Sequence, residues 1–250
     1  RAIRKPLYAM LLAGLHSLAG ADYAGIVAWQ VVVLALFPAV VFALGQRLGG
    51  RLAGLAAAGF IIFREANAIR LGAVVNLSHA KLLMADLPAA LGLALLALAA
   101  FHWLRRRPGS GLAALAVGGL MGALMLLRSQ QLTLIPVLAL LALLALRAAG
   151  LEWRALFIRL ALFFVGVGLV AGPWLLRNKS LTGEWIVEQS TAASFLAQRY
   201  SEDPDSIQVA FLPGESEGEY YARHMATVKE YMASHPREVV AFAADNYTRN

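Results

Sequence analysis

The chain has 250 residues, of which 60% are hydrophobic and only 15% charged, and its mean hydropathy is +0.65. A soluble domain typically contains about 45–50% apolar and about 25% charged residues, so this composition argues against a water-soluble globule and predicts helices in lipid. The net charge of +7 is spread between apolar runs, which argues against a nucleic-acid partner and favours lipid headgroups or a phosphate ligand.

Five apolar runs predict transmembrane helices, because a helix that spans a bilayer needs about 20 mostly apolar residues. These runs are Tyr23–Gln46, Leu87–Leu104, Gly111–Leu127, Leu132–Leu146 and Leu160–Leu176. Ahead of them, Pro6–Ala21 predicts an interfacial or partly inserted helix. Leu52–Phe63 is too short to span alone and leads into the polar segment Arg64–Lys81. It is either a sixth, short span or a broken helix that lines a cavity.

The last apolar run ends in Gly172–Asn178, where a Trp is followed by Arg and Asn, as expected at the headgroup layer. Beyond it the composition turns polar, and Glu219–Ser234 and Arg237–Tyr247 have helical spacing. We therefore expect an all-α fold: a polytopic transmembrane bundle of five to six spans in residues 1–179, followed by a mostly helical extracytoplasmic segment in residues 180–250. Because the chain begins at Arg1, we expect a fragment of a longer protein.

Three Arg-rich loops, Gly45–Arg51, Arg105–Ser110 and Arg147–Arg154, favour the cytoplasmic side of the membrane. The opposite side also carries cations, among them Lys5 and Arg128. This excess on the far side predicts an anionic ligand there.

Asp86 is the first candidate site residue, since ionisable groups next to apolar runs are costly. It begins a predicted span, with Pro88 in the first turn. Either the helix dipole favours this carboxylate, or it faces a cavity and assists a metal, an acceptor hydroxyl or a neighbouring cation. His79 and Lys81 lie within two turns and predict a small polar cluster, although His79 alone also fits a wet interfacial residue.

Arg128 and Lys5 are the candidate phosphate ligands. Arg128 follows an apolar run and is either a snorkelling anchor or a bidentate phosphate clamp. Lys5 is either a point-charge phosphate ligand or a headgroup contact. No residue is predicted to bind a metal, since the chain has no cysteine and no paired-histidine spacing. Clustered glycines predict close helix packing; they are Gly118, Gly119, Gly122, Gly166 and Gly168.

Three motifs in a fixed order resemble a known family. Arg4-Lys5-Pro6-Leu7-Tyr8, a span and then Gly45–Arg51 resemble "KPPLY … ARRLFGRR"; Gly118–Pro136 resembles "GLLLGLALLTRPTALLLLP"; and Gly172–Gly183 resembles "APWTLRNYLVFG". Together they are similar to the family 39-like glycosyltransferases of the GT-C superfamily, which includes protein mannosyltransferases and bacterial aminoarabinose transferases.

The resemblance implies a multi-pass enzyme of the bacterial inner membrane that transfers a sugar, with inversion, from a polyprenyl-phosphate donor to an extracytoplasmic protein, lipid or glycan acceptor. It implies that Lys5 and Arg128 contact the donor phosphate and that the catalytic-site lining includes Asp86. His79 and Lys81 are further candidates for that lining. Lys5, Arg128 and Asp86 are accordingly expected to share a hollow on the non-cytoplasmic side.

Two departures from the family limit what this chain can hold. Some members carry a metal-binding Glu where this chain has Arg4, so the need for a divalent metal stays open. The family's principal catalytic Asp lies upstream of the "KP" motif, so the general base is expected outside this chain. Two alternatives remain: a transporter or flippase-type protein for an anionic lipid or solute, and an assembly protein without chemistry.

Overall fold

The computed structural model describes residues 5–20, 22–72, 79–183, 185–188 and 209–249, together with 193, 196, 197, 200 and 207. The structure is 84% helix, and the described residues form no strand, which confirms the predicted all-α fold. It comprises two compact units, Lys5–Trp174 and a second that contains Leu175–Asn250. The limit between the units falls at Leu175, a little before the predicted domain boundary at Lys179.

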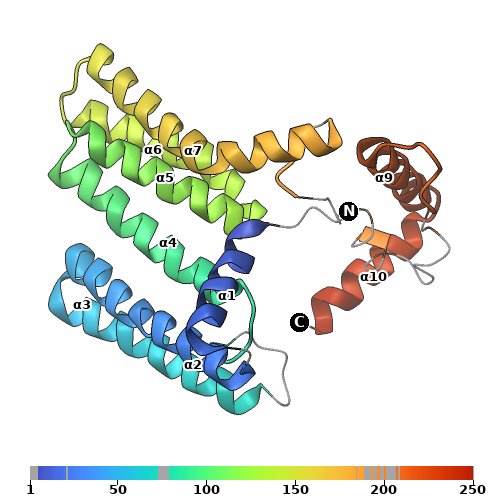
Figure 1. Ribbon diagram of the computed structural model, residues 1–250, viewed down its shortest axis with the longest axis horizontal. Helices are drawn as coiled ribbons and strands as arrows, with labels where there is room; N and C mark the ends of the chain where they lie inside the picture. Colours follow the sequence, from blue (N-terminus) through green and yellow to red (C-terminus); the bar gives the residue numbers. More distant parts are fainter. Residues whose placement is uncertain are drawn as a thin grey trace. The chain divides into compact units, whose positions relative to one another are not determined.

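Seven helices begin in the first unit (Figure 1). They are α1 (Pro6–Ala19), α2 (Tyr23–Leu34), α3 (Leu36–Leu71), α4 (Asp86–Phe101), α5 (Gly111–Leu127), α6 (Leu134–Ala148) and α7 (Trp153–Thr182). A π-helical turn, His102–Arg106, follows α4, and a 3₁₀ turn, Ser129–Thr133, precedes α6. The predicted span Tyr23–Gln46 is interrupted at Ala35, since Pro38 has no N–H to bond the carbonyl four residues earlier.

Helix α3 is a hairpin of two antiparallel arms, 36–48 and 51–71, which lie side by side in Figure 1. Gly50 reverses the chain with a positive φ of 84°, a conformation that glycine adopts without strain. The arms pack so closely that a Cβ added at Gly54 would lie 2.7 Å from the Phe42 carbonyl oxygen. The second arm extends the predicted helix Leu52–Phe63 as far as Leu71. The expectation of a polar segment beginning at Arg64 was therefore wrong over its first eight residues.

Helices α5 and α7 cross at glycines, as their clustering predicted. A Cβ at Gly118 would lie 1.9 Å from the Phe163 carbonyl oxygen, and one at Gly166 would lie 2.2 Å from the Leu115 carbonyl oxygen. Such a close approach of two backbones requires residues without a side chain. Gly168, in contrast, faces open space. Beside this crossing, Trp103 stacks on Phe163 with ring centroids 6.4 Å apart, and both residues are fully buried.

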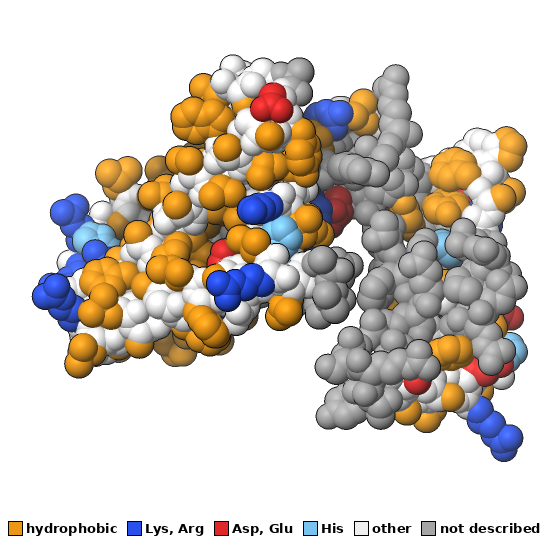
Figure 2. Space-filling view, turned by 90° about the horizontal axis from the view of Figure 1, so that it is seen from below, with side chains coloured by type: hydrophobic (Ala, Val, Ile, Leu, Met, Phe, Trp, Pro, Cys, Tyr) orange, Lys and Arg blue, Asp and Glu red, His pale blue; other side chains and the backbone are white. Residues whose placement is uncertain are grey.

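Four helices are long and apolar enough to cross a membrane: Tyr23–Leu71, Asp86–Arg106, Ser129–Ala148 and Trp153–Leu181. The first of these contains both arms of the α3 hairpin. Helix α5, which was predicted as a span, has 17 residues and contributes much of the buried core. Large apolar side chains cover the exterior, as the space-filling view shows (Figure 2). A surface of this composition suits lipid better than water.

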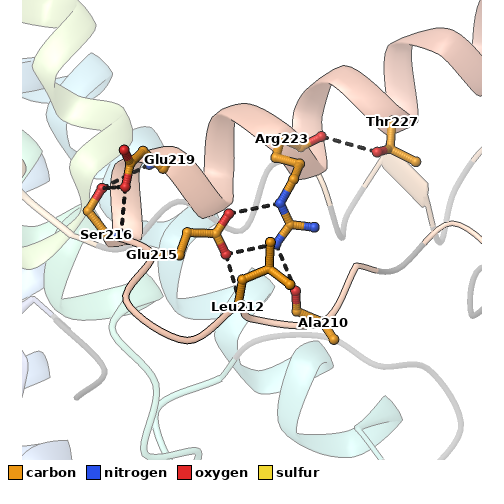
Figure 3. A network of polar contacts seen from close by, with 7 residues as sticks. All are labelled: Ala210, Leu212, Glu215, Ser216, Glu219, Arg223 and Thr227. Atoms are coloured by element: carbon orange, nitrogen blue, oxygen red, sulfur yellow. Dashed lines mark hydrogen bonds and ion pairs between the residues drawn. The ribbon is translucent and has the colours of Figure 1, made fainter.

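The second unit contains α9 (Glu217–Ser234) and α10 (Pro236–Arg249), close to the two helices predicted there. Helix α9 begins with a capping box, in which the Ser216 hydroxyl accepts from the Glu219 N–H while the Glu219 carboxylate accepts from the Ser216 N–H. Arg223 donates to both carboxylate oxygens of Glu215, at 2.8 and 2.7 Å (Figure 3). These bonds lower the pKa of Glu215 and tie the loop before α9 to the helix.

Candidate functional site

Two predicted site residues meet at one end of the first unit. Asp86 is the first residue of α4, and Arg128 is the C-cap of α5. Nη1 of Arg128 donates a hydrogen bond to Oδ1 of Asp86, and the two residues lie 42 positions apart in the sequence. Their side chains are 34% and 35% exposed. The pair is therefore open to a ligand, while each charge has an opposite charge beside it.

Beneath this pair, Gln30 joins α2 to the loop that leads into α4. Its side chain is 1% exposed, and its Nε2 donates to the carbonyl oxygens of Ala80 and Leu82 at 2.8 and 2.9 Å. Its Oε1 accepts from the hydroxyl of Tyr8 in α1 at 2.9 Å. Both amide hydrogens and the amide oxygen thus have partners, which removes most of the cost of burying a primary amide.

Glu65, from the second arm of α3, holds the same loop from another side. Its Oε1 accepts from the Ala80 N–H at 2.6 Å, and its Oε2 lies 3.3 Å from Nη1 of Arg64. Ala80 therefore has its N–H bound to α3 and its carbonyl bound to α2. Residues 79–85, which we call the α4-entry loop, are held by both helices immediately before Asp86.

The structure places the remaining predicted residues on segments next to this cluster. Lys81 is exposed on the α4-entry loop, and His79 is half-buried with its Nε2 facing Gly72. Lys5 is the N-cap of α1, and α1 packs on α5, the helix that ends at Arg128. Tyr8 of α1 is close enough to Asp86 for the charges to interact. Burial, then Tyr23, then Asp86 raise the pKa of Tyr8 to about 12, so its hydroxyl stays a donor.

An apolar cavity of about 170 Å³ lies among α2, both arms of α3 and the start of α4. Its wall includes Leu34, Ile61, Glu65, Ala80 and Leu87. The predicted hollow shared by Lys5, Arg128 and Asp86 is a different place, since none of those three residues lines this cavity. The cavity instead lies behind the α4-entry loop, next to the two residues that hold it.

Within the described ranges, no group of three or more histidine, aspartate or glutamate side chains is arranged to hold a metal ion. Arg4, which occupies the place of a family metal ligand, lies outside the described residues. The charged chemistry of the described site consists of the Asp86–Arg128 pair and the neighbouring lysines. Such a set suits binding of an anion such as a phosphate.

Three residues of this cluster were missed from the sequence: Tyr8, Gln30 and Glu65. One signal for Gln30 was present, since it is the lone amide in the otherwise apolar run of α2, and a polar side chain at such a place needs partners. Glu65 was read as part of a polar segment, so no separate role was assigned to it. The bond from Tyr8 depends on how α1 lies on α2, which spacing along the chain does not reveal.

No protein family, curated protein or solved structure matches this chain. The fold and the cluster together define an all-helical chain with four candidate membrane-crossing helices and a charged pair at the head of one of them. The resemblance to glycosyltransferases rests on the three motifs alone.

Proposed function

We propose that this chain is the membrane-embedded part of a glycosyltransferase that moves a sugar, with inversion, from a polyprenyl-phosphate donor to an extracytoplasmic acceptor. The observation that carries the proposal is the contact between Asp86 and Arg128. The motifs suggested these two residues separately, and they meet at one partly exposed place. The order of the three motifs supports the same activity.

In this proposal Arg128 holds the donor phosphate. A guanidinium has five N–H donors in a planar fork, and the contact with Asp86 uses Nη1, which leaves other donors for phosphate oxygens. Asp86 then acts as the orienting partner of Arg128. Lys5 supplies the second positive charge at the start of α1. His79 and Lys81 are proposed to line the acceptor side of the site.

The proposed reaction is a single displacement at the anomeric carbon. An acceptor oxygen forms the new bond to that carbon, the bond to the phosphate oxygen breaks, and the phosphate leaves with the electron pair. The acceptor proton passes to a base that we place outside this chain. Arg128 and Lys5 stabilise the charge that develops on the leaving phosphate, an effect that grows where water is excluded. The need for a divalent metal stays open.

We propose that the protein lies in the bacterial plasma membrane with its Arg-rich loops in the cytoplasm. The tip of the α3 hairpin, the turn between α4 and α5, and the turn between α6 and α7 lie at the same end of the first unit in Figure 1. Lys and Arg side chains gather at that end in Figure 2. Asp86 and Arg128 belong to the opposite ends of α4 and α5, so they would face outward, and residues 180–250 would be extracytoplasmic.

The test uses the full-length protein in proteoliposomes with a panel of polyprenyl-phosphate sugars. Arg128→Gln and Lys5→Ala are each expected to reduce transfer by about 100-fold or more, the usual loss when one donor to a developing oxyanion is removed. Arg147→Gln, at an exposed arginine of the other end of the bundle, is the matched control and should keep full transfer. Membrane insertion should be normal in all three.

Unchanged turnover in both Arg128→Gln and Lys5→Ala would refute the proposal. If the wild-type protein moves lipid phosphate across the bilayer without sugar transfer, the flippase reading replaces it. The structure offers that reading less support than the sequence did, because helix α3 continues unbroken from Arg51 to Leu71 where a broken helix had been considered.

A further inference from the structure

We propose that Gln30 is a positioning residue that sets where α4 begins and thereby where Asp86 meets Arg128. The structural part of this inference stands by itself. Its consequence for sugar transfer rests on the proposed function.

The first step concerns the start of α4, which its own sequence does not fix. The N-cap residue is Ala85, which has no side chain that could bond the free N–H groups of the first turn. A Ser, Thr, Asp or Asn at this position would hold the start of a helix in place. Helix α4 therefore needs another device to define its first residue, and that residue is Asp86.

The second step identifies this device as the Gln30 amide. Its two hydrogens bond the carbonyls of Ala80 and Leu82, two residues apart in the α4-entry loop. The loop itself turns through bonds from the Leu82 N–H to His79 and from the Met84 N–H to Leu82, at 3.0 and 2.8 Å. Because one planar amide holds two carbonyls, it fixes the direction of the loop as well as its position.

The third step is that Gln30 is itself held in place. Tyr8 donates to its Oε1, so the amide cannot flip without losing this bond and turning its oxygen toward the carbonyls. Glu65 holds the Ala80 N–H from the other side. Gln30 touches neither Asp86 nor Arg128 in any described hydrogen bond, so it acts through the loop.

The experiment uses the absence of cysteine from this chain. A nitroxide attached at Met84→Cys, a 47% exposed position in the α4-entry loop, reports the order of the loop in proteoliposomes. Gln30→Met removes both donations with little change in shape. Gln46→Met makes the same replacement at an exposed glutamine of α3 and serves as the matched control.

We expect the nitroxide to gain a mobile component in Gln30→Met and to stay unchanged in Gln46→Met. Tyr8→Phe keeps both donations from Gln30 and should give a smaller change. It also serves as the milder variant if Gln30→Met fails to fold. An equally immobile label in Gln30→Met and the wild type would overturn the proposal.

A second readout separates positioning from general weakening. Gln30→Met should raise the KM for the donor by about tenfold, since displacements near 1 Å at a site cost up to about 100-fold. In the background of Arg128→Gln, the same change should cause almost no further loss, because the residue that it positions is already gone. Independent, multiplying losses would overturn the positioning role.

The two proposals fail differently. If the wild-type protein transfers no sugar but the nitroxide responds as expected, the glycosyltransferase assignment fails and the role of Gln30 stands on the label and on a cycle of unfolding measurements. In that cycle, the energetic coupling between Asp86→Asn and Arg128→Gln should be at least halved in the Gln30→Met background. An unchanged coupling would overturn the role.

Discussion

The α5–α7 crossing should not tolerate a single methyl group at Gly118. A Cβ there would lie 1.9 Å from the Phe163 carbonyl oxygen, about 1.5 Å short of ordinary contact at 3.4 Å. Because the clashing atom belongs to the backbone, no side-chain rotation relieves it and the two helices must separate. The separation would also disturb Trp103, which stacks on Phe163.

The magnitude follows from two opposing terms. Overpacking of a well-packed core costs about 1–3 kcal/mol, and this clash, against backbone, belongs near the upper end. Replacing glycine by alanine inside a helix returns about 1 kcal/mol. Gly118→Ala should therefore lower the free energy of unfolding by about 2 kcal/mol, whereas Gly168→Ala, where a Cβ meets nothing within 4 Å, should raise it by up to about 1 kcal/mol.

Titration of the protein with SDS in dodecylmaltoside micelles measures both variants, with tryptophan fluorescence and far-UV circular dichroism as the signals. Gly166→Ala, on the other side of the crossing, should resemble Gly118→Ala, because its Cβ would lie 2.2 Å from the Leu115 carbonyl oxygen. Equal unfolding midpoints for Gly118→Ala and Gly168→Ala would refute the reasoning, since the two differ only in what the added methyl meets.

Three further outcomes are expected. A double-mutant cycle with Asp86→Asn and Arg128→Gln should give a coupling of about 1 kcal/mol, as for partly exposed pairs near a helix end; a value near zero would contradict the contact. The bonds from Arg223 lower the pKa of Glu215, so its stabilising contribution is full above the usual value of 4.5 and is lost as the pH falls through its lower, folded-state pKa. Hydrogen exchange of α9 should therefore speed up in acid, and Glu215→Gln should remove that part of the pH dependence. Ser216→Ala should cost about 1 kcal/mol in the first turn of α9, measured by local hydrogen exchange; unchanged protection there would contradict the capping box.

The helices could be predicted because run length and apolar content decide whether a segment spans a bilayer. The end of α3 could not, because charge alone does not end a helix. Arg64 and Glu65 sit in the middle of the second arm, 3.3 Å from each other and only partly exposed, so the helix accommodates them. It continues to Leu71, where Gly72 follows as the C-cap.

The site was predicted residue by residue but not as a contact. Asp86 and Arg128 each stood out as charges at the edges of apolar runs. Their meeting depends on α4 and α5 running antiparallel, so that the first residue of one helix lies beside the C-cap of the other. A separation of 42 residues carries no trace of that register. Gln30 was passed over because a single amide does not interrupt an apolar run.

The polar groups inside the first unit follow one rule of supply. A helix satisfies its own backbone, whereas a loop that enters an apolar layer brings N–H and carbonyl groups that water cannot reach. Gln30 and Glu65 come from within helices, and both bond Ala80, a buried residue of the α4-entry loop. Their presence in otherwise apolar helices is therefore explained by what the loop lacks. Since that loop ends at Asp86, replacing either side chain should be felt first at the charged pair and only afterwards in the stability of the bundle.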